Sequence, residues 1–586
     1  MAFWNPVRAR AWAGFCRYGG ACGGPSIALP PATLSGHSPA VQQTSETHGQ
    51  ALKAAIARFE SGERVGAIEA CRALVETVPQ ARPTLALMLL RAGHLTEGVE
   101  ALDSLLDEHP DNAALLAHRG TAHLHLGTME AARADLERAV AIDPHQGEAW
   151  LSLAGLHRRA GDMTTMLAVL EQAAKALPGH PGIAANRATA IAEHGDAAEA
   201  VALLEPLVAA APERATLAFN LGTALRRLGR LDEAEHHLGR AVEIDPGYAP
   251  AWHNLGNTRI DRGDVEGGFA AYRQAHTLRR KPGGPMRDEH SFVATSATKL
   301  AHDIEQLSWL REQALLGPEW DARITAYRLT LETLPSAQDD THMVALPPAA
   351  APIRNVYNRL VHADPGARID GPAVSPGFDG AAAEEMYRDN VPGIAWGDGL
   401  LTPEALAALR HFCLASTIWY EFRYDNGYLG AFQEEGFDCP LLLQIAQELR
   451  AAMPGIVGPH SLRKTWAFKY DSRLSGIRMH ADAAAVNVNF WLTPDEANLD
   501  AQGGGLVVWD KEAPMSWDFA RYNRDTPAVR AHLEEVGAKS VIVPHRQNRA
   551  VLFNSDLFHE TGAFDFRPGY ENRRINVTML FGRRGD

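Results

Sequence analysis

Long apolar runs and an excess of positive charge are both missing from this sequence. No run of eighteen apolar residues occurs, so no membrane-spanning helix is expected. The formal net charge of −15 argues against a nucleic-acid-binding surface as the main property of the chain. We therefore expect neither a membrane nor a nucleic acid as a partner.

Cysteine is scarce and follows no pattern. The five cysteines form neither a paired framework nor a zinc-binding spacing: Cys16, Cys22, Cys71, Cys413 and Cys439. A reducing compartment is the simplest interpretation, and we expect the cytoplasm.

Acidic residues are absent before Glu46, while Arg8, Arg10 and Arg17 stand among many Ala, Gly, Ser and Pro residues. This composition is compatible with a transit peptide, a disordered leader or a mis-set start codon. We assign residues 1–47 to a disordered or targeting leader. The 586-residue chain is long enough for two or more domains, and 46% hydrophobic residues suffice for packed cores.

A repeat of fixed length governs residues 48–282. Glycines recur every 34 residues at Gly93, Gly127, Gly161, Gly195, Gly229 and Gly263. Prolines keep the same step at Pro110, Pro144, Pro178, Pro212 and Pro246. A glycine that serves the turn between two short helices, and a proline that stops the second helix, explain the pattern. A further copy at Gly62 and Pro79, three residues out of phase, brings the expected number to about seven.

The copy from Trp252 to Ala275 indicates the kind of repeat. Its Trp252, Leu255-Gly256 and Ala275 resemble the tetratricopeptide repeat, which has a period of 34 residues. This resemblance implies an all-α solenoid with a concave groove, because one helix pair cannot bury its apolar face alone. We expect a protein or peptide partner in the groove. A spacer or an oligomerisation surface is the alternative, and the oligomeric state stays open.

The periodicity ends after Lys281-Pro282-Gly283-Gly284. Residues 283–334 predict helices that cap the last repeat, and the prolines of residues 335–399 indicate a linker. A second domain, residues 400–586, opens with a helix start at Thr402-Pro403. Its second helix is expected from Leu441 to Met453.

Residue types that bind metals gather in the last fifth of the chain. His480 and Asp482 are two apart, so a strand would point both at the same ion. His559 follows the apolar run Ala550-Val551-Leu552-Phe553, which predicts another strand. Two histidines and one carboxylate on one face form the facial triad that binds Fe(II) and leaves positions open for a co-substrate and O2.

The order of motifs from Trp466 onwards resembles the 2-oxoglutarate- and Fe(II)-dependent dioxygenases. The pattern comprises Tyr470 to Gly476, the His480-x-Asp482 pair, the glycine run Gly503-Gly504-Gly505 and the apolar strand before His559. The resemblance implies a double-stranded β-helix, or jelly roll, with flanking helices and the metal between its two sheets. It also implies substrate oxidation coupled to decarboxylation of 2-oxoglutarate to succinate, with ascorbate as an accessory reductant.

A cation is needed where a buried carboxylate of 2-oxoglutarate would lie. Alternation puts Arg574, Asn576 and Thr578 on one strand face. We assign the far carboxylate to Arg574, whose planar fork donates to both oxygens, with Asn576 as a second donor. The family's basic residue often follows the distal histidine more closely than the fifteen positions found here. Arg567 and Arg573 therefore stay open as alternatives.

Other polar residues near these motifs have two interpretations each. His545 is a competing second histidine, but the polar turn around it predicts a loop residue. Tyr470 resembles a tyrosine that donates its hydroxyl to 2-oxoglutarate in similar enzymes, and is otherwise an ordinary core residue. Asn487, Asn489 and Trp491 share one strand face, which lines the cavity or is a solvated face of the sheet.

The expected architecture has two domains, an N-terminal all-α repeat solenoid and a C-terminal jelly roll with flanking helices. We expect an Fe(II)- and 2-oxoglutarate-dependent dioxygenase, a hydroxylase, whose repeats recruit a protein substrate or partner. The charged insert from Trp509 to Ala538 is a candidate for substrate selection. The alternatives are a repeat scaffold with a relic oxygenase fold, and an oxygenase for a small molecule or glycan that uses its repeats for assembly.

Overall fold

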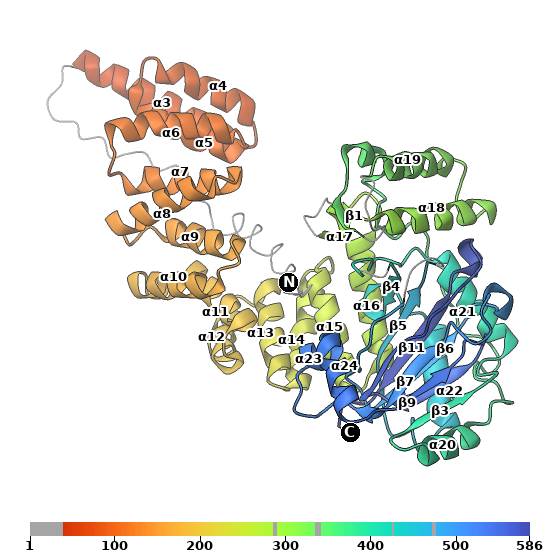
Figure 1. Ribbon diagram of the computed structural model, residues 1–586. Helices are drawn as coiled ribbons and strands as arrows, with labels where there is room; N and C mark the ends of the chain where they lie inside the picture. The colour runs from red at the N-terminus through yellow and green to blue at the C-terminus, as the bar shows by residue number, and fades with distance from the viewer. Residues whose placement is uncertain (1–38, 285–289, 335–341, 425–426, 472–475, 586) are drawn as a thin grey trace. The chain divides into compact units, whose positions relative to one another are not determined.

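The structure is a computed structural model that describes residues 39–284, 290–334, 342–424, 427–471 and 476–585. The chain divides into two compact units, Met1–Glu233 and Ala234–Asp586 (Figure 1). Most of the expected leader, residues 1–38, lies outside the described residues, as do residues 472–475 of the motif that starts at Tyr470. No helix in the described ranges is both long and apolar enough to cross a membrane.

The described part of the first unit is helical. Its helices are α3 (Pro39–Glu60), α4 (Arg64–Val75), α5 (Arg82–Ala92), α6 (Leu95–Glu108), α7 (Ala113–Leu126), α8 (Met129–Ile142), α9 (Gly147–Arg159), α10 (Met163–Ala176), α11 (Pro181–His194), α12 (Ala197–Ala210) and α13 (Ala215–Arg227). A short 3-10 turn, η2 (Pro79–Ala81), precedes α5, and α14 (Leu231–Ile244) crosses the boundary between the units.

The recurring glycines and prolines end the helices as the 34-residue period predicts. Glycines 93, 127, 161, 229 and 263 adopt φ between 74° and 91°, which only glycine adopts without strain. Gly195 is the exception, with φ −104°. Helices α6, α8, α10, α12 and α14 each end two residues before a recurring proline. The 34-residue period therefore predicts where the first and the second helix of most pairs end.

The second unit combines helices with sheets. Its further helices are α15 (Ala249–Arg262), α16 (Val265–Arg280), α17 (His290–Val293), α18 (Ala297–Glu312), α19 (Trp320–Glu332), α20 (Gly380–Asp389), α21 (Pro403–Ala415), α22 (Pro440–Ala452), α23 (Phe519–Arg524) and α24 (Thr526–Glu535), with 3-10 turns η3 (Pro348–Ile353), η4 (Gln433–Glu435), η5 (Asp495–Ala497) and η6 (Tyr570–Asn572). Its strands are β1 (Ala294–Thr295), β2 (Val344–Ala345), β3 (Ile394–Gly397), β4 (Leu429–Phe432), β5 (Leu462–Lys469), β6 (Val486–Trp491), β7 (Leu506–Glu512), β8 (Ser540–Val543), β9 (Ala550–Asn554), β10 (Leu557–Thr561) and β11 (Ile575–Phe581).

Two antiparallel sheets form the core of this unit, besides the short pair β1-β2. The larger has the order β3-β9-β6-β11-β5-β4, and the smaller has the order β10-β7-β8. One face of the larger sheet packs on α21 and α22 through residues such as Phe490, Val577 and Leu409. The other face shares a core with the smaller sheet through Trp491 and Val508. The C-terminal region is therefore sheet-rich, and in its described part the two sheets do not close into one.

The last helix pair, α15 and α16, belongs to the second unit rather than the first. A guanidinium nitrogen of Arg463, in β5, lies 2.5 Å from the Asp261 carboxylate in α15. Arg280 in α16 pairs with Glu435 at 2.5 Å and stacks on the Tyr420 ring. The array of repeats thus ends as part of the sheet-containing unit.

The residues between the last repeat and residue 400 also pack in this unit. In α18, Gln306 donates hydrogen bonds to the carbonyls of Leu414 and Ser416 at the end of α21. The segment expected as a linker, described from residue 342, supplies α20 and the edge strand β3 of the larger sheet. Proline density without periodicity gave no sign of that strand.

Candidate metal centre

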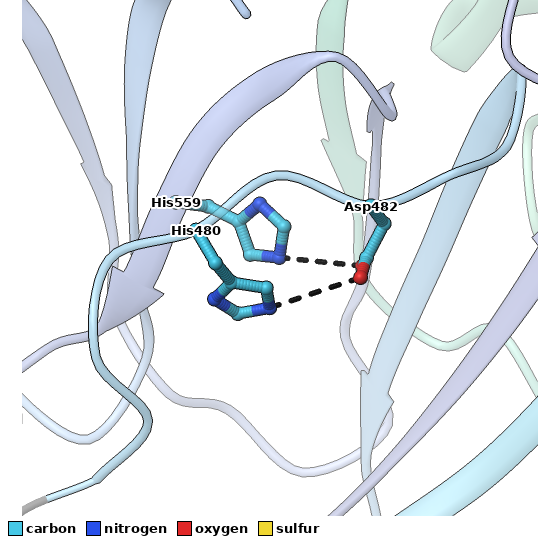
Figure 2. A group of neighbouring side chains, drawn as sticks. All are labelled: His480, Asp482 and His559. Atoms are coloured by element: carbon cyan, nitrogen blue, oxygen red, sulfur yellow. Dashed lines mark ion pairs between the residues drawn. The ribbon is translucent and has the colours of Figure 1, made fainter. Parts of the chain in front are cut away.

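The three residues of the expected triad lie together beside the smaller sheet. His559 lies in β10, and His480 forms an antiparallel bridge with it, with N···O distances of 3.0 and 2.8 Å. The His480 Nε2 atom is 3.8 Å from Asp482 Oδ1, and the His559 Nε2 atom is 3.5 Å from Asp482 Oδ2 (Figure 2). All three ligand atoms lie within 4.8 Å of one another. This is the only such group of three metal-binding side chains within the described ranges.

The tautomer of both histidines follows from their neighbours. His480 Nδ1 lies 2.8 Å from the Arg478 carbonyl oxygen, and His559 Nδ1 lies 3.0 Å from the Leu557 carbonyl oxygen. A ring nitrogen that faces a carbonyl must carry the hydrogen, so both Nδ1 atoms donate. The Nε2 lone pairs of the neutral rings then point toward the carboxylate of Asp482.

This donor set fits a metal ion. Two lone pairs and a carboxylate that face one another repel, unless a cation or a proton lies between them. Burial lowers the pKa of His480 to about 4, which disfavours a proton on its Nε2 atom. Two imidazole nitrogens and one carboxylate oxygen are the ligands of the facial triad that holds non-haem Fe(II).

A single cavity connects the triad to the expected anion-binding residues. It is lined by His480, Asp482 and His559 together with Tyr470, Arg574 and Asn576. Strands β5, β6 and β11 form one wall, because they are neighbours in the larger sheet. Alternation in β5 directs Trp466 and Phe468 into the same cavity, and Thr561 of β10 lines the opposite side. Trp466, Phe468 and Thr561 were not expected at the site, although the alternation along β5 indicates that the two aromatic residues share one face.

Arg574 is a buried cation that has only neutral partners. Its side chain is among the largest fully buried ones, at 1% exposure. The guanidinium donates to the carbonyl oxygen of Gly504 at 2.5 Å and to Asn576 Oδ1 at 3.4 Å. It also lies 4.5 Å from the centre of the Tyr470 ring. Burial lowers its pKa, and no carboxylate of the described residues contributes to raising it. A buried guanidinium in this state is a site for an anion.

The two alternative arginines lie elsewhere. Arg573 forms an ion pair with Glu305 at 2.6 Å and with Asp471 at 3.5 Å, and it does not line the cavity. Arg567 is exposed. Of the three candidates, only Arg574 reaches the cavity.

His545 lies in a loop, as predicted, but it is buried. Its ring packs 5.7 Å from that of Trp491 and 5.1 Å from that of Phe566. Burial lowers its pKa to about 3. Because it does not line the cavity, it is not part of the triad.

The asparagine face of β6 is buried rather than solvated. Asn487 is 0% exposed and Asn489 is 4% exposed. Asn489 and Trp491 line the cavity, and Asn487 donates to Asp482 Oδ2 at 2.7 Å. This face therefore supports the triad directly.

The charged insert braces the triad instead of bordering the cavity. In α23, the carbonyl of Tyr522 accepts a hydrogen bond from the Ala481 amide at 3.1 Å. Asn523 donates to the Ala481 carbonyl at 2.8 Å. No residue between Trp509 and Ala538 lines the cavity. The insert thus holds Ala481, the residue between His480 and Asp482, in place, and its role in substrate selection stays a prediction.

Comparison with known proteins bears on the helical part of the chain. Family models described as tetratricopeptide repeat match residues 84–147, 130–181 and 191–257. No curated protein matches the chain.

Solved structures are similar over part of the chain. A tetratricopeptide repeat protein from Parabacteroides merdae is 16% identical, with 40% of this chain and 93% of that chain covered and a TM-score of 0.33. YrrB, a TPR protein with an unusual peptide-binding site, is 20% identical, with 31% and 93% covered and a TM-score of 0.28. MamA from Desulfovibrio magneticus is 21% identical, with 28% and 94% covered and a TM-score of 0.27. The family models identify the helices between residues 84 and 257 as tetratricopeptide repeats.

Proposed function

We propose that the chain is an Fe(II)- and 2-oxoglutarate-dependent dioxygenase, a hydroxylase, whose repeats recruit a protein or peptide. One observation carries the proposal: three convergent metal ligands line the same cavity as a buried arginine that has no acidic partner in the described part of the chain. A metal site alone has many uses. A metal site beside an anion site matches a co-substrate that carries a chelating group at one end and a carboxylate at the other.

Each residue has a distinct task in this proposal. His480, Asp482 and His559 hold the metal, and their fixed orientation leaves the other coordination positions open. Arg574 binds the far carboxylate of 2-oxoglutarate, assisted by Asn576. Tyr470, which stacks on Arg574 and lies 3.4 Å from the Thr561 hydroxyl, closes that end of the cavity. The bound iron and co-substrate supply the oxidation of a C–H bond by O2, and the protein orients them and excludes water.

The strand order supports a double-stranded β-helix. In the larger sheet β5, β11, β6 and β9 are consecutive neighbours, and in the smaller sheet β10 lies beside β7. The segment before Asp482 pairs with β10 through the His480–His559 bridge and through the hydrogen bond from the Thr561 amide to the Ile477 carbonyl, 3.1 Å long. When the segment from Ile477 to His480 is counted as a fourth strand of the smaller sheet, that sheet and the four central strands of the larger sheet face each other as two layers, and successive strands of the chain fall mostly in opposite layers. The metal would lie between these layers, as in a double-stranded β-helix.

Recruitment through the repeats rests on their architecture. Stacked helix pairs form an extended concave surface, which repeats of this kind use to hold peptides or proteins. The substrate would then be a protein held by the repeats while one of its side chains enters the cavity. The three cysteines within the described ranges, Cys71, Cys413 and Cys439, are free thiols, which agrees with a reducing compartment in which Fe(II) stays reduced.

Anaerobic iron binding tests the metal and anion sites together. The metal-free protein is titrated with Fe(II), with and without 2-oxoglutarate, beside His480→Ala and the matched control His545→Ala. We expect one ferrous ion per chain, bound more tightly with 2-oxoglutarate, in the unchanged protein and in the control, and none in His480→Ala. Equal iron binding by all three proteins would place the metal elsewhere.

A further inference from the structure

Three asparagines connect the two charged ends of the cavity. Starting from the metal ligand, Asn487 Nδ2 donates to Asp482 Oδ2 at 2.7 Å, and Asn489 Nδ2 donates to Asn487 Oδ1 at 2.5 Å. Asn576 Nδ2 lies 3.5 Å from Asn489 Oδ1, and Arg574 Nη1 lies 3.4 Å from Asn576 Oδ1. We name the side chains of Asn487, Asn489 and Asn576 the amide relay.

The direction of the amide relay is fixed from both ends. An ionised carboxylate only accepts, so the amide nitrogen of Asn487 must face Asp482 and its oxygen must face Asn489. A guanidinium only donates, so the amide oxygen of Asn576 must face Arg574 and its nitrogen must face Asn489. Both conditions give the same orientation for all three amides. Every hydrogen bond therefore points from the cation toward the metal ligand.

The larger sheet holds the relay in register. Asn489 pairs with Thr578 and Trp491 pairs with Asn576 across β6 and β11, which places the relay side chains on one buried face. Thr578 connects two of the amides: Asn576 Nδ2 lies 3.5 Å from its hydroxyl, which donates to Asn489 Oδ1 at 2.6 Å. No polar atom of the three amides lacks a hydrogen-bond partner among the described residues. The two longest bonds, 3.4 and 3.5 Å, both involve Asn576, the member beside the expected anion.

We propose that Asn487 and Asn489 are positioning residues that couple anion binding at Arg574 to metal binding at Asp482. The inference rests on the proposed function, because it assigns a role at the same site. Aligned hydrogen bonds polarise one another in a buried environment, so a cation at one end draws charge from the carboxylate at the other. An anion on Arg574 neutralises that cation, and Asp482 then gives more of its charge to the metal. The metal and the anion thereby bind cooperatively.

The relay also restricts the carboxylate geometrically. The hydrogen bond from Asn487 to Oδ2 holds the Asp482 carboxylate in an orientation in which each of its oxygens faces one histidine Nε2 atom. Outer hydrogen-bond partners of this kind change metal affinity by roughly 10- to 100-fold when they are removed. Asn489 lines the cavity but is hydrogen-bonded to none of the three metal ligands, so its replacement tests the relay without altering a metal ligand or removing Asn487.

Cobalt and glutarate test the relay in the full chain. Co(II) reports its coordination by visible absorption, and glutarate carries both carboxylates of 2-oxoglutarate but lacks the keto group that chelates a metal. We compare the unchanged protein with Asn489→Leu, which removes both relay hydrogen bonds of Asn489, and with Thr578→Val, which removes the route through the Thr578 hydroxyl and keeps the direct contact of Asn576 with Asn489. We expect Asn489→Leu to weaken Co(II) binding about 10-fold, to shift the absorption bands, and to abolish the tightening by glutarate. Thr578→Val should change the affinity less than about 3-fold and keep the glutarate effect.

The outcomes separate the relay from the metal site. Unchanged cobalt affinity and bands in Asn489→Leu overturn the relay and leave the metal centre intact. If Asn489→Leu binds cobalt more weakly but glutarate still tightens that binding as much as in the unchanged protein, Asn489 only packs against the site. This result also overturns the coupling. If the unchanged protein binds no cobalt, the proposed function fails, and the relay fails with it. Should Asn489→Leu not fold, as judged by its circular dichroism, Asn489→Ala replaces it with the same expectations.

Discussion

Arg573 and Arg574 are neighbours in the sequence, yet their guanidinium groups have opposite surroundings. Arg573 pairs with two carboxylates, whereas Arg574 has carbonyl oxygens, an amide and two aromatic rings. Strand alternation accounts for the difference, because successive residues face opposite sides of a sheet. The unpaired charge of Arg574 therefore stays available to a ligand in the cavity.

Replacing Arg574 should weaken 2-oxoglutarate binding selectively. Arg574→Gln removes hydrogen bonds to a charged group, each of which contributes about 1.5–3 kcal/mol, so we expect the KM for 2-oxoglutarate to rise roughly 10- to 100-fold. Iron binding without co-substrate should persist. The matched control is Arg567→Gln, which alters an exposed arginine and should leave the KM unchanged. A larger effect in the control would move the anion site to Arg567.

The sequence specified the site residues better than their surroundings. The spacing of His480 and Asp482 and the alternation after Arg574 predicted that the metal ligands and the expected anion-binding residues share one cavity, but not that Trp466, Phe468 and Thr561 also line it. The choice among three arginines needed the structure, because it depends on which carboxylates lie nearby. The burial of Asn487 and Asn489 could not be predicted from the sequence either, because a strand face of alternating polar residues is usually exposed to solvent.

At the scale of elements, the glycine run supports the anion site through its backbone. A Cβ atom on Gly505 would lie 1.7 Å from the Val543 carbonyl oxygen, so β7 begins where only glycine fits against the end of β8. The carbonyl oxygens of Gly504 and Gly505 both face the guanidinium of Arg574, at 2.5 and 3.4 Å. The run therefore positions Arg574, a role that the motif order alone did not reveal.

Adding one methyl group to this run should affect both stability and co-substrate binding. Gly505→Ala forces the backbone apart, and we expect it to lower the free energy of unfolding by roughly 1–3 kcal/mol. It should also raise the KM for 2-oxoglutarate, because the displaced carbonyls no longer fix Arg574. The contrasting variant is Gly239→Ala in α14, where a Cβ meets nothing within 4 Å. That change should stabilise the chain by roughly 0.5–1 kcal/mol. If Gly505→Ala and the unchanged protein have the same melting temperature, the close approach of Gly505 to the Val543 carbonyl oxygen is refuted.

The contact between α16 and the loop before α22 should make stability depend on pH. Burial raises the pKa of Asp438 to about 7, although the nearby Arg273 opposes the shift. Because its folded pKa lies above its unfolded value, the carboxyl is protonated in the folded chain and ionised in the unfolded chain between about pH 4 and 7. Stability therefore falls as the pH rises through this window, by at most about 1.4 kcal/mol per pH unit.

Asp438→Asn removes that dependence, because an amide does not ionise. We expect the variant to have a higher melting temperature than the unchanged protein at pH 8 and a similar one at pH 5, measured by thermal unfolding of the full chain. The same difference at both pH values would show that Asp438 is ionised in the folded state throughout.

On the scale of the whole molecule, the boundary between the two compact units does not coincide with the end of the repeats. The sequence period extends through residue 282, so it assigns α15 and α16 to the solenoid, whereas their contacts place them in the sheet-containing unit. Side chains of α16 complete this unit: His276 lies 3.0 Å from the Tyr420 hydroxyl, and Arg280 pairs with Glu435. Periodicity reports how a helix pair is built, but not which neighbour it packs against.

Two truncations should therefore behave differently. A chain beginning at residue 247 keeps α15 and α16, and we expect it to fold and to bind iron and 2-oxoglutarate. A chain beginning at residue 283 loses His276 and the ion pairs of Arg279 and Arg280 with Glu435, and it should aggregate or melt at a lower temperature. Solubility, circular dichroism and iron content distinguish them. If the repeats recruit a protein substrate, the longer truncated chain should turn over 2-oxoglutarate but lose activity toward that protein. Identical behaviour of the two truncated chains would contradict the assignment of the last repeat.

The production of succinate from 2-oxoglutarate tests the central claim most directly. The full chain is incubated with Fe(II), ascorbate, O2 and 2-oxoglutarate, beside His559→Ala and the matched control His545→Ala. The account predicts succinate from the unchanged protein and from the control, and a loss of at least about 100-fold in His559→Ala, which lacks one of three metal ligands. Succinate formation that is equal in His559→Ala and the unchanged protein would contradict it.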